Sequence, residues 1–69
     1  MAAYFVTVKR RGISPIQVTM LVRAHSRDAA GELASVLAER ERGGLFEPRR
    51  IRRARADELV GTVAFDDLP

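Results

Sequence analysis

The chain has 69 residues with a formal net charge of +3 and no cysteine, so disulfides and thiolate metal sites are excluded and a reducing compartment is favoured. Hydrophobic residues make up 46% and charged residues 30%, which is typical of one ordered globular domain, here expected over residues 1–69. A core of this size leaves no room for the deep pocket of a large enzyme.

Two segments near the start of the chain predict a hairpin. Residues 4–9 are mostly aromatic and β-branched, as strands are, with Tyr4, Val6 and Val8 on one face, and at least one of Tyr4 and Phe5 is expected in the core. Residues 10–15 contain glycine, serine and proline and form the loop. Residues 16–24 alternate again, and one face of this second strand is expected to be core: Ile16, Val18, Met20, Val22 and Ala24.

The next segment, residues 27–42, predicts a helix. Ser26 is a good N-cap, and Asp28 in the first turn suits the positive end of the helix dipole. Gly43-Gly44 ends the helix, because glycine takes the left-handed C-cap conformation without steric cost. A buried stripe is expected at three-and-four spacing, formed by Ala29, Ala30, Leu33, Ala34, Val36 and Leu37.

Two further segments follow the helix. Residues 49–55 form an extended, strongly basic segment suited to an edge strand, and Pro48 favours an edge or a strand start. Residues 59–65 fit a fourth strand or a short helix, because their apolar spacing is compatible with both. The sequence therefore predicts an α+β fold of order ββαββ, in which an antiparallel sheet of three to four strands packs one helix on one face.

Residues that could carry catalysis are few. The single histidine, His25, lies beside Ser26 and Asp28, but these two have capping roles. One histidine with scattered carboxylates has no metal-ligand spacing, and Gly43-Gly44 ends a helix where a phosphate loop would begin one. We therefore expect neither an enzyme nor a bound metal or cofactor.

The densest charged feature is the arginine run, five arginines within residues 49–55. On a regular strand Arg50 and Arg52 would share one face, and Arg49, Arg53 and Arg55 the other. Contact with nucleic-acid phosphates or an acidic protein groove suits the planar, bidentate guanidinium. Two alternatives stay open. One is a solvated edge strand paired internally with Glu39, Glu41, Glu47 or the acids after residue 56; the other is a basic targeting or processing signal.

A second basic group, Lys9-Arg10-Arg11, falls in the first loop and could also be an ordinary solvated turn. If both groups lie at one end of the sheet, they place about eight cations on one surface, enough for a salt-sensitive phosphate contact. Base-specific recognition is not expected, because the interleaved aromatics of an RNA-recognition sheet are absent. The candidate partner-binding or nucleic-acid-binding residues are Lys9, Arg10, Arg11, Arg49, Arg50, Arg52, Arg53 and Arg55.

The chain runs from Ala2-Ala3-Tyr4 in the first strand to Ala24-His25-Ser26 after the second, then to Ala30 and Ala34-Ser35 in the helix and to a final basic hairpin. This layout resembles that of small phage-encoded anti-CRISPR proteins. The resemblance implies a non-enzymatic inhibitor that binds a CRISPR surveillance complex and blocks or diverts its DNA recognition. It also implies that basic residues such as Arg49, Arg50 and Arg52 lie at the contact.

The sequence thus favours a binding module, an inhibitor or modulator of a nucleoprotein complex that contacts nucleic acid or an acidic groove through its arginine-rich edge. The alternative is a small structural or accessory subunit that docks in a larger complex or forms a homodimer along Tyr4–Val8. No apolar run approaches the roughly 20 residues of a membrane span, and Met1-Ala2-Ala3 lacks the basic start of a signal peptide. We therefore expect a cytoplasmic location and no membrane partner.

Overall fold

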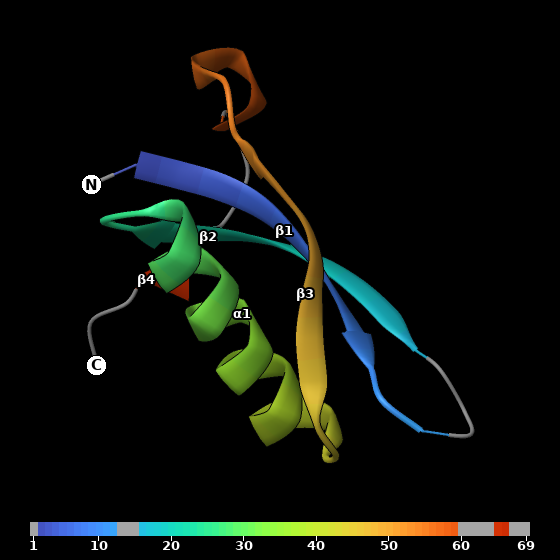
Figure 1. The fold of residues 1–69 in the computed structure, drawn as a ribbon. Coiled ribbons are helices and arrows are strands. Elements are labelled where there is room, and N and C mark those ends of the chain that lie inside the picture. The colour runs from blue at the N-terminus through green and yellow to red at the C-terminus, as the bar shows by residue number, and fades with distance from the viewer. Residues whose placement is uncertain (1, 13–15, 60–64, 67–69) are drawn as a thin grey trace.

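The computed structural model describes residues 2–12, 16–59 and 65–66 (Figure 1). The elements are β1 (Ala2–Arg10), β2 (Gln17–Ala24), α1 (Arg27–Arg42), β3 (Phe46–Arg53), the 3-10 helix η1 (Ala56–Leu59) and the two-residue β4 (Phe65–Asp66). The sheet has the order β3-β1-β2-β4, and α1 packs across one face of its three long antiparallel strands. The predicted α+β layout is confirmed.

The β1–β2 hairpin is regular along its whole length. Its pairing runs from Ala2 opposite Ala24 to Lys9 opposite Gln17, and the backbone N–H of Arg10 donates to the carbonyl of Ile16 at 2.8 Å. Strand alternation therefore places one set of side chains under α1, as predicted. Tyr4 belongs to that set and is only 8% exposed. The buried residues that form the core are Tyr4, Val6, Val8, Val22, Ala24, Ala30, Ala34, Ala38 and Phe46.

The basic strand β3 lies at an edge of the sheet, as predicted, but it begins at Phe46 and ends at Arg53. Its pairing with β1 contains a β-bulge, because Val8 lies opposite Pro48 while the preceding Thr7 lies opposite Arg50. Arg49 is therefore an extra residue without a partner position on β1. The sequence pattern did not predict this bulge.

Both ends of α1 are capped as predicted. The Ser26 Oγ accepts a hydrogen bond from the backbone N–H of Ala29 at 3.1 Å, and Gly43 adopts a φ of 76° while its N–H donates to the carbonyl of Glu39 at 2.9 Å. The left-handed φ explains why glycine stands there. No helix in the part of the chain that the structure describes is long and apolar enough to cross a membrane.

The predicted buried stripe of α1 is confirmed at Ala30 and Ala34 and is wrong at Val36. Val36, predicted in the stripe, is 43% exposed, and Leu33 and Leu37 are only half-buried. The residues that face the sheet are smaller: Ala30, Gly31, Ala34, Ser35 and Ala38. Small side chains let the helix approach β3 closely, since a Cβ on Gly31 would lie 3.0 Å from Ile51 Cδ1 and 3.3 Å from Pro48 Cγ.

Two expectations about the sheet are not met. The fourth strand or short helix predicted over residues 59–65 is not shown: Leu59 belongs to η1, residues 60–64 lie outside the described residues, and β4 pairs in parallel with Val22 and Arg23 only. The segment Tyr4–Val8, predicted as a dimer edge, lies in β1 between β2 and β3. A central strand has both edges hydrogen-bonded, so this segment cannot accept a second chain.

Candidate nucleic-acid interface

The face of the sheet opposite α1 carries polar and cationic side chains together with Phe5 and Leu21, which lie opposite each other on β1 and β2; Leu21, predicted outside the core, is only 4% exposed. Thr7 and Thr19 lie opposite each other on β1 and β2, with their hydroxyl oxygens 2.8 Å apart in a hydrogen bond. Together with Gln17, Arg49 and Arg50, they line a hollow of about 400 Å³. We call this surface the arginine face and define it by Thr7, Gln17, Thr19, Arg49, Arg50 and Arg52.

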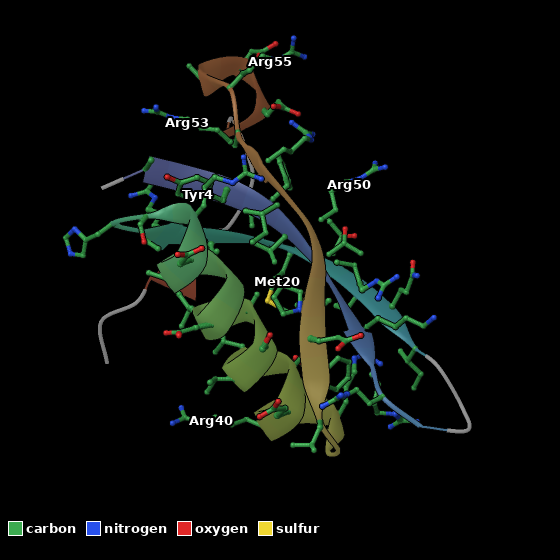
Figure 2. All side chains as sticks on the ribbon, viewed as in Figure 1. Tyr4, Met20, Arg40, Arg50, Arg53 and Arg55 are labelled. Atoms are coloured by element: carbon green, nitrogen blue, oxygen red, sulfur yellow. The ribbon has the colours of Figure 1, made fainter. Side chains whose placement is uncertain are left out.

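The prediction that Arg49 shares a face with Arg53 and Arg55 is wrong, and the β-bulge is the reason. The extra residue interrupts the two-residue alternation, so that Arg49 and Arg50 both line the hollow. Figure 2 shows Arg50 directed away from α1 and Arg53 on the other side of β3. Arg55 follows the end of β3, in the turn before η1. The bulge thus concentrates two adjacent guanidinium groups on one face.

The two basic groups do not gather at one end of the sheet. Because β1 and β3 are antiparallel, Lys9 and Arg10 lie opposite the start of β3, whereas Arg52 and Arg53 lie at its far end. Alternation also divides the first group, since Lys9 shares a face with Thr7, while Arg10 lies on the other face with its side chain against Gly44. The cations therefore form a row along β1 and β3, not a terminal cluster.

Glutamates neutralise part of this row. Glu47 pairs with Arg49, with Nη1 and Oε1 3.3 Å apart, and with Arg11, with Nε and Oε2 3.6 Å apart. Glu58 pairs with Arg52 and Arg55. Among the residues that the structure describes, Lys9, Arg50 and Arg53 make no ion pair. Internal pairing, predicted as an alternative to partner contact, accounts for part of the arginine run and leaves other cations available.

Arg52 is the most constrained of these arginines. Its Nη1 and Nη2 donate to Glu58 Oε1 and Oε2 at 2.9 and 2.7 Å, and its guanidinium carbon lies 4.7 Å from the centre of the Phe5 ring. Glu58 also accepts a hydrogen bond from the backbone N–H of Arg55 at 2.9 Å. Sequence reasoning considered Phe5 both as core and as an exposed ring near the basic surface, but no sequence pattern showed that it would lie opposite Arg52.

These contacts lower the pKa of Glu58 to about 2. The hydrogen bonds from the Arg52 guanidinium are the largest cause, followed by the hydrogen bond from the backbone of Arg55. The same contact raises the pKa of Arg52. Both groups therefore stay charged throughout the physiological range.

We expect the fold to lose stability as the pH falls from about 4.5 to about 2, the ordinary and the folded-state pKa of Glu58. In this window the unfolded chain binds a proton at Glu58 that the folded chain does not, so acid favours unfolding, while the contribution is fully present above the window. Urea unfolding at several pH values should show a steeper decline for the native chain than for Glu58→Gln. Asp57→Asn, at a neighbouring exposed carboxylate, serves as the control and should keep the steep decline. Equal slopes for the native chain and Glu58→Gln would contradict this prediction.

The rest of the described surface offers less chemistry. His25 is exposed between β2 and α1. Among the described residues, no group of three or more His, Cys, Asp or Glu side chains could hold a metal ion. A second hollow, of about 530 Å³ between α1 and β3, has Asp28 and Glu32 in its lining together with Pro48 and Ile51. Its carboxylates would repel phosphate, so the arginine face is the better candidate for a nucleic acid.

Comparison with known proteins gives no match: neither a protein-family model, nor a curated protein, nor a solved structure matches this chain. The resemblance in layout to anti-CRISPR proteins therefore stays a prediction.

Proposed function

We propose that this protein is a non-enzymatic binding module that contacts the phosphate backbone of nucleic acid and thereby modulates a nucleoprotein complex. The observation that supports this proposal is the hollow in the arginine face, where Arg49 and Arg50 stand beside the hydroxyls of Thr7 and Thr19. Guanidinium and hydroxyl groups are among the donors that contact phosphate oxygens in nucleic-acid complexes. Three paired strands carry these donors, so binding does not require a loop to become ordered.

The length of the cationic row also suits a polyanion. Lys9, Thr7 and Phe5 share one face of β1. On β3, Arg50 lies opposite Thr7 and Arg52 lies opposite Phe5. From residue 5 to residue 9 a strand extends roughly 13 Å, which allows contact with more than one phosphate of a chain. A single carboxylate on a protein surface would engage only one point of this row.

The nature of the complex follows from the resemblance in layout to small phage-encoded anti-CRISPR proteins. It makes the proposed partner a CRISPR surveillance complex and the proposed action an interference with DNA recognition. A cytoplasmic location belongs to the same proposal, because such a complex must be reached where it works. An acidic protein groove in the same complex is the alternative contact for the arginine run.

The alternative of a dimerising accessory subunit finds little support at the β3 edge. Pro48 lacks a backbone N–H, and the Arg27 guanidinium donates to the carbonyl of Ile51 at 2.7 Å. Both features remove groups that a second chain would need for strand pairing.

The proposal is tested by the salt dependence of binding to labelled oligonucleotides. If three or four phosphates are neutralised, the binding constant should fall about 10- to 100-fold between 50 and 200 mM salt. An Arg40→Ala variant serves as a control, since Arg40 lies near the end of α1, away from β3 (Figure 2), and should keep the same slope. Binding that is absent or independent of salt, together with a concentration-dependent dimer, would contradict the proposal and favour the accessory subunit.

A further inference from the structure

We infer that the arginine face binds single-stranded nucleic acid, with one base stacked on the Arg52 guanidinium and a neighbouring phosphate in the hollow beside Arg49 and Arg50. This inference rests on the proposed function. It adds the form of the nucleic acid and assigns different tasks to arginines that look equivalent in the sequence.

The geometry of Arg52 makes it a planar platform. Two of its nitrogens donate to the two carboxylate oxygens of Glu58 in the plane of the guanidinium, and the Phe5 ring lies 4.7 Å from the guanidinium carbon. The side chain of Arg52 is nevertheless 52% exposed. Unpaired bases stack on aromatic rings and on the planes of arginine guanidinium groups. Glu58 already occupies two of the five N–H donors of Arg52, so a phosphate at Arg52 would compete with a bound carboxylate, whereas a base on the face of the guanidinium would not.

Arg50, unlike Arg52, has a guanidinium group that is available to bind an anion. No carboxylate pairs with it among the described residues. It lies beside Arg49 and the two threonine hydroxyls in the hollow. One threonine hydroxyl donates to the other, so the donors left among these groups are the two guanidinium groups and one hydroxyl, which suits an anion with several acceptor oxygens.

The Arg52 guanidinium and the hollow beside Arg50 are separated by a distance that one nucleotide can span. Arg52 and Arg50 lie opposite Phe5 and Thr7, which are two residues apart on β1, so the platform and the hollow are roughly 7 Å apart along the strands. In a duplex, the faces of internal bases are covered by neighbouring pairs. Only an unpaired base can reach the platform while its phosphate occupies the hollow.

Glu58 is the positioning residue in this arrangement. It holds Arg52 through two hydrogen bonds and is itself held by the backbone N–H of Arg55. Because these bonds occupy donors at the rim of the guanidinium, Arg52 offers a flat surface with little capacity to select among bases. We therefore expect tolerance of base sequence, which is typical of recognition through stacking.

Fluorescence anisotropy with three labelled probes tests the inference: a short oligothymidylate, an abasic strand with the same number of phosphates, and a duplex of the same length. The native protein should bind the oligothymidylate about tenfold or more tightly than the abasic strand, because stacking contributes a base-dependent term. It should also bind the oligothymidylate more tightly than the duplex.

Two substitutions and one control variant locate the effect. Arg52→Lys keeps the charge but removes the plane, so it should lower the affinity for oligothymidylate to that for the abasic strand and leave the latter unchanged. Arg40→Lys, near the end of α1 and away from β3, is the matched control and should leave the affinities for all three probes unchanged. Phe5→Leu, which keeps an apolar side chain beneath Arg52, should weaken oligothymidylate binding selectively. Thermal melting establishes that each variant is folded.

The outcomes separate this inference from the proposed function. Equal affinity for oligothymidylate and the abasic strand, or tighter binding of the duplex, would overturn base stacking while phosphate contact remained supported. Loss of affinity for all probes in Arg52→Lys would overturn the division of tasks, since Arg52 would then be a phosphate contact. Absence of binding to every probe would overturn both proposals.

Discussion

Phe46→Ala is expected to lower the free energy of unfolding by about 3–5 kcal/mol, because it removes a large buried ring and leaves a cavity. Phe46 is 6% exposed and packs in the core at the start of β3. Its backbone N–H also donates to Glu39 Oε2 of α1 at 3.0 Å. Both the ring and the backbone of Phe46 therefore connect β3 to the rest of the fold. A domain of this size has a total stability on the order of 3–10 kcal/mol. The variant should therefore be largely unfolded or close to its melting transition at room temperature, as measured by urea titration with circular dichroism.

The adjacent residue provides a control for this substitution. Leu45 is 63% exposed, so Leu45→Ala should change the free energy of unfolding by less than about 0.5 kcal/mol. Leu37→Ala, at a half-buried position on α1, should fall between these two values. If Phe46→Ala melted like Leu45→Ala, the ring could not be part of the core.

The double substitution Arg49→Ala and Arg50→Ala should weaken nucleic-acid binding on the order of 100-fold at low salt. Each guanidinium is expected to make a charge-assisted hydrogen bond, and such bonds contribute about 1.5–3 kcal/mol. The salt dependence should also become shallower, by about 0.7 in the logarithmic slope for each phosphate of a single strand that the variant no longer neutralises. Both effects can be measured by the same anisotropy titration.

Thermal stability distinguishes a binding defect from a folding defect in this variant. Arg49 is paired only with Glu47 among the described residues, at a surface where both side chains are largely exposed, and such pairs contribute little to folding. The double variant should therefore melt close to the native chain. Arg40→Ala with Arg42→Ala removes the same charge from the end of α1; an equal loss of affinity in this control would show that net charge, and not the arginine face, attracts the nucleic acid.

The features that local chemistry controls could be predicted from the sequence. Ser26 and Gly43 mark the ends of α1 because side-chain capping and a left-handed φ depend on single residues. The alternation of Val18, Met20, Val22 and Ala24 identified the face of β2 that packs in or against the core, because strand periodicity is independent of the partner strand.

The features that depend on two distant segments could not be predicted from the sequence. The burial of Gly31 on α1 follows from its close approach to Pro48 and Ile51, which amphipathic spacing alone does not predict. The pairing of Glu58 with Arg52 follows from where η1 returns after β3. For the candidate site, the arginine run was evident as a composition, but its division into paired and available cations required the register between β1 and β3.

The β-bulge at Arg49 bears on how this surface can change during evolution. Phe46, Pro48 and Ile51 contact the core or α1, and Glu47 and Arg50 lie opposite Lys9 and Thr7. Without Arg49 these five residues would alternate as an unbroken strand and keep the same sides. Deletion of the Arg49 codon would therefore remove the bulge and leave one guanidinium group in the hollow instead of two. No core residue would move to the other side of the strand. At this position the charge density of the surface can be changed by insertion or deletion as well as by substitution.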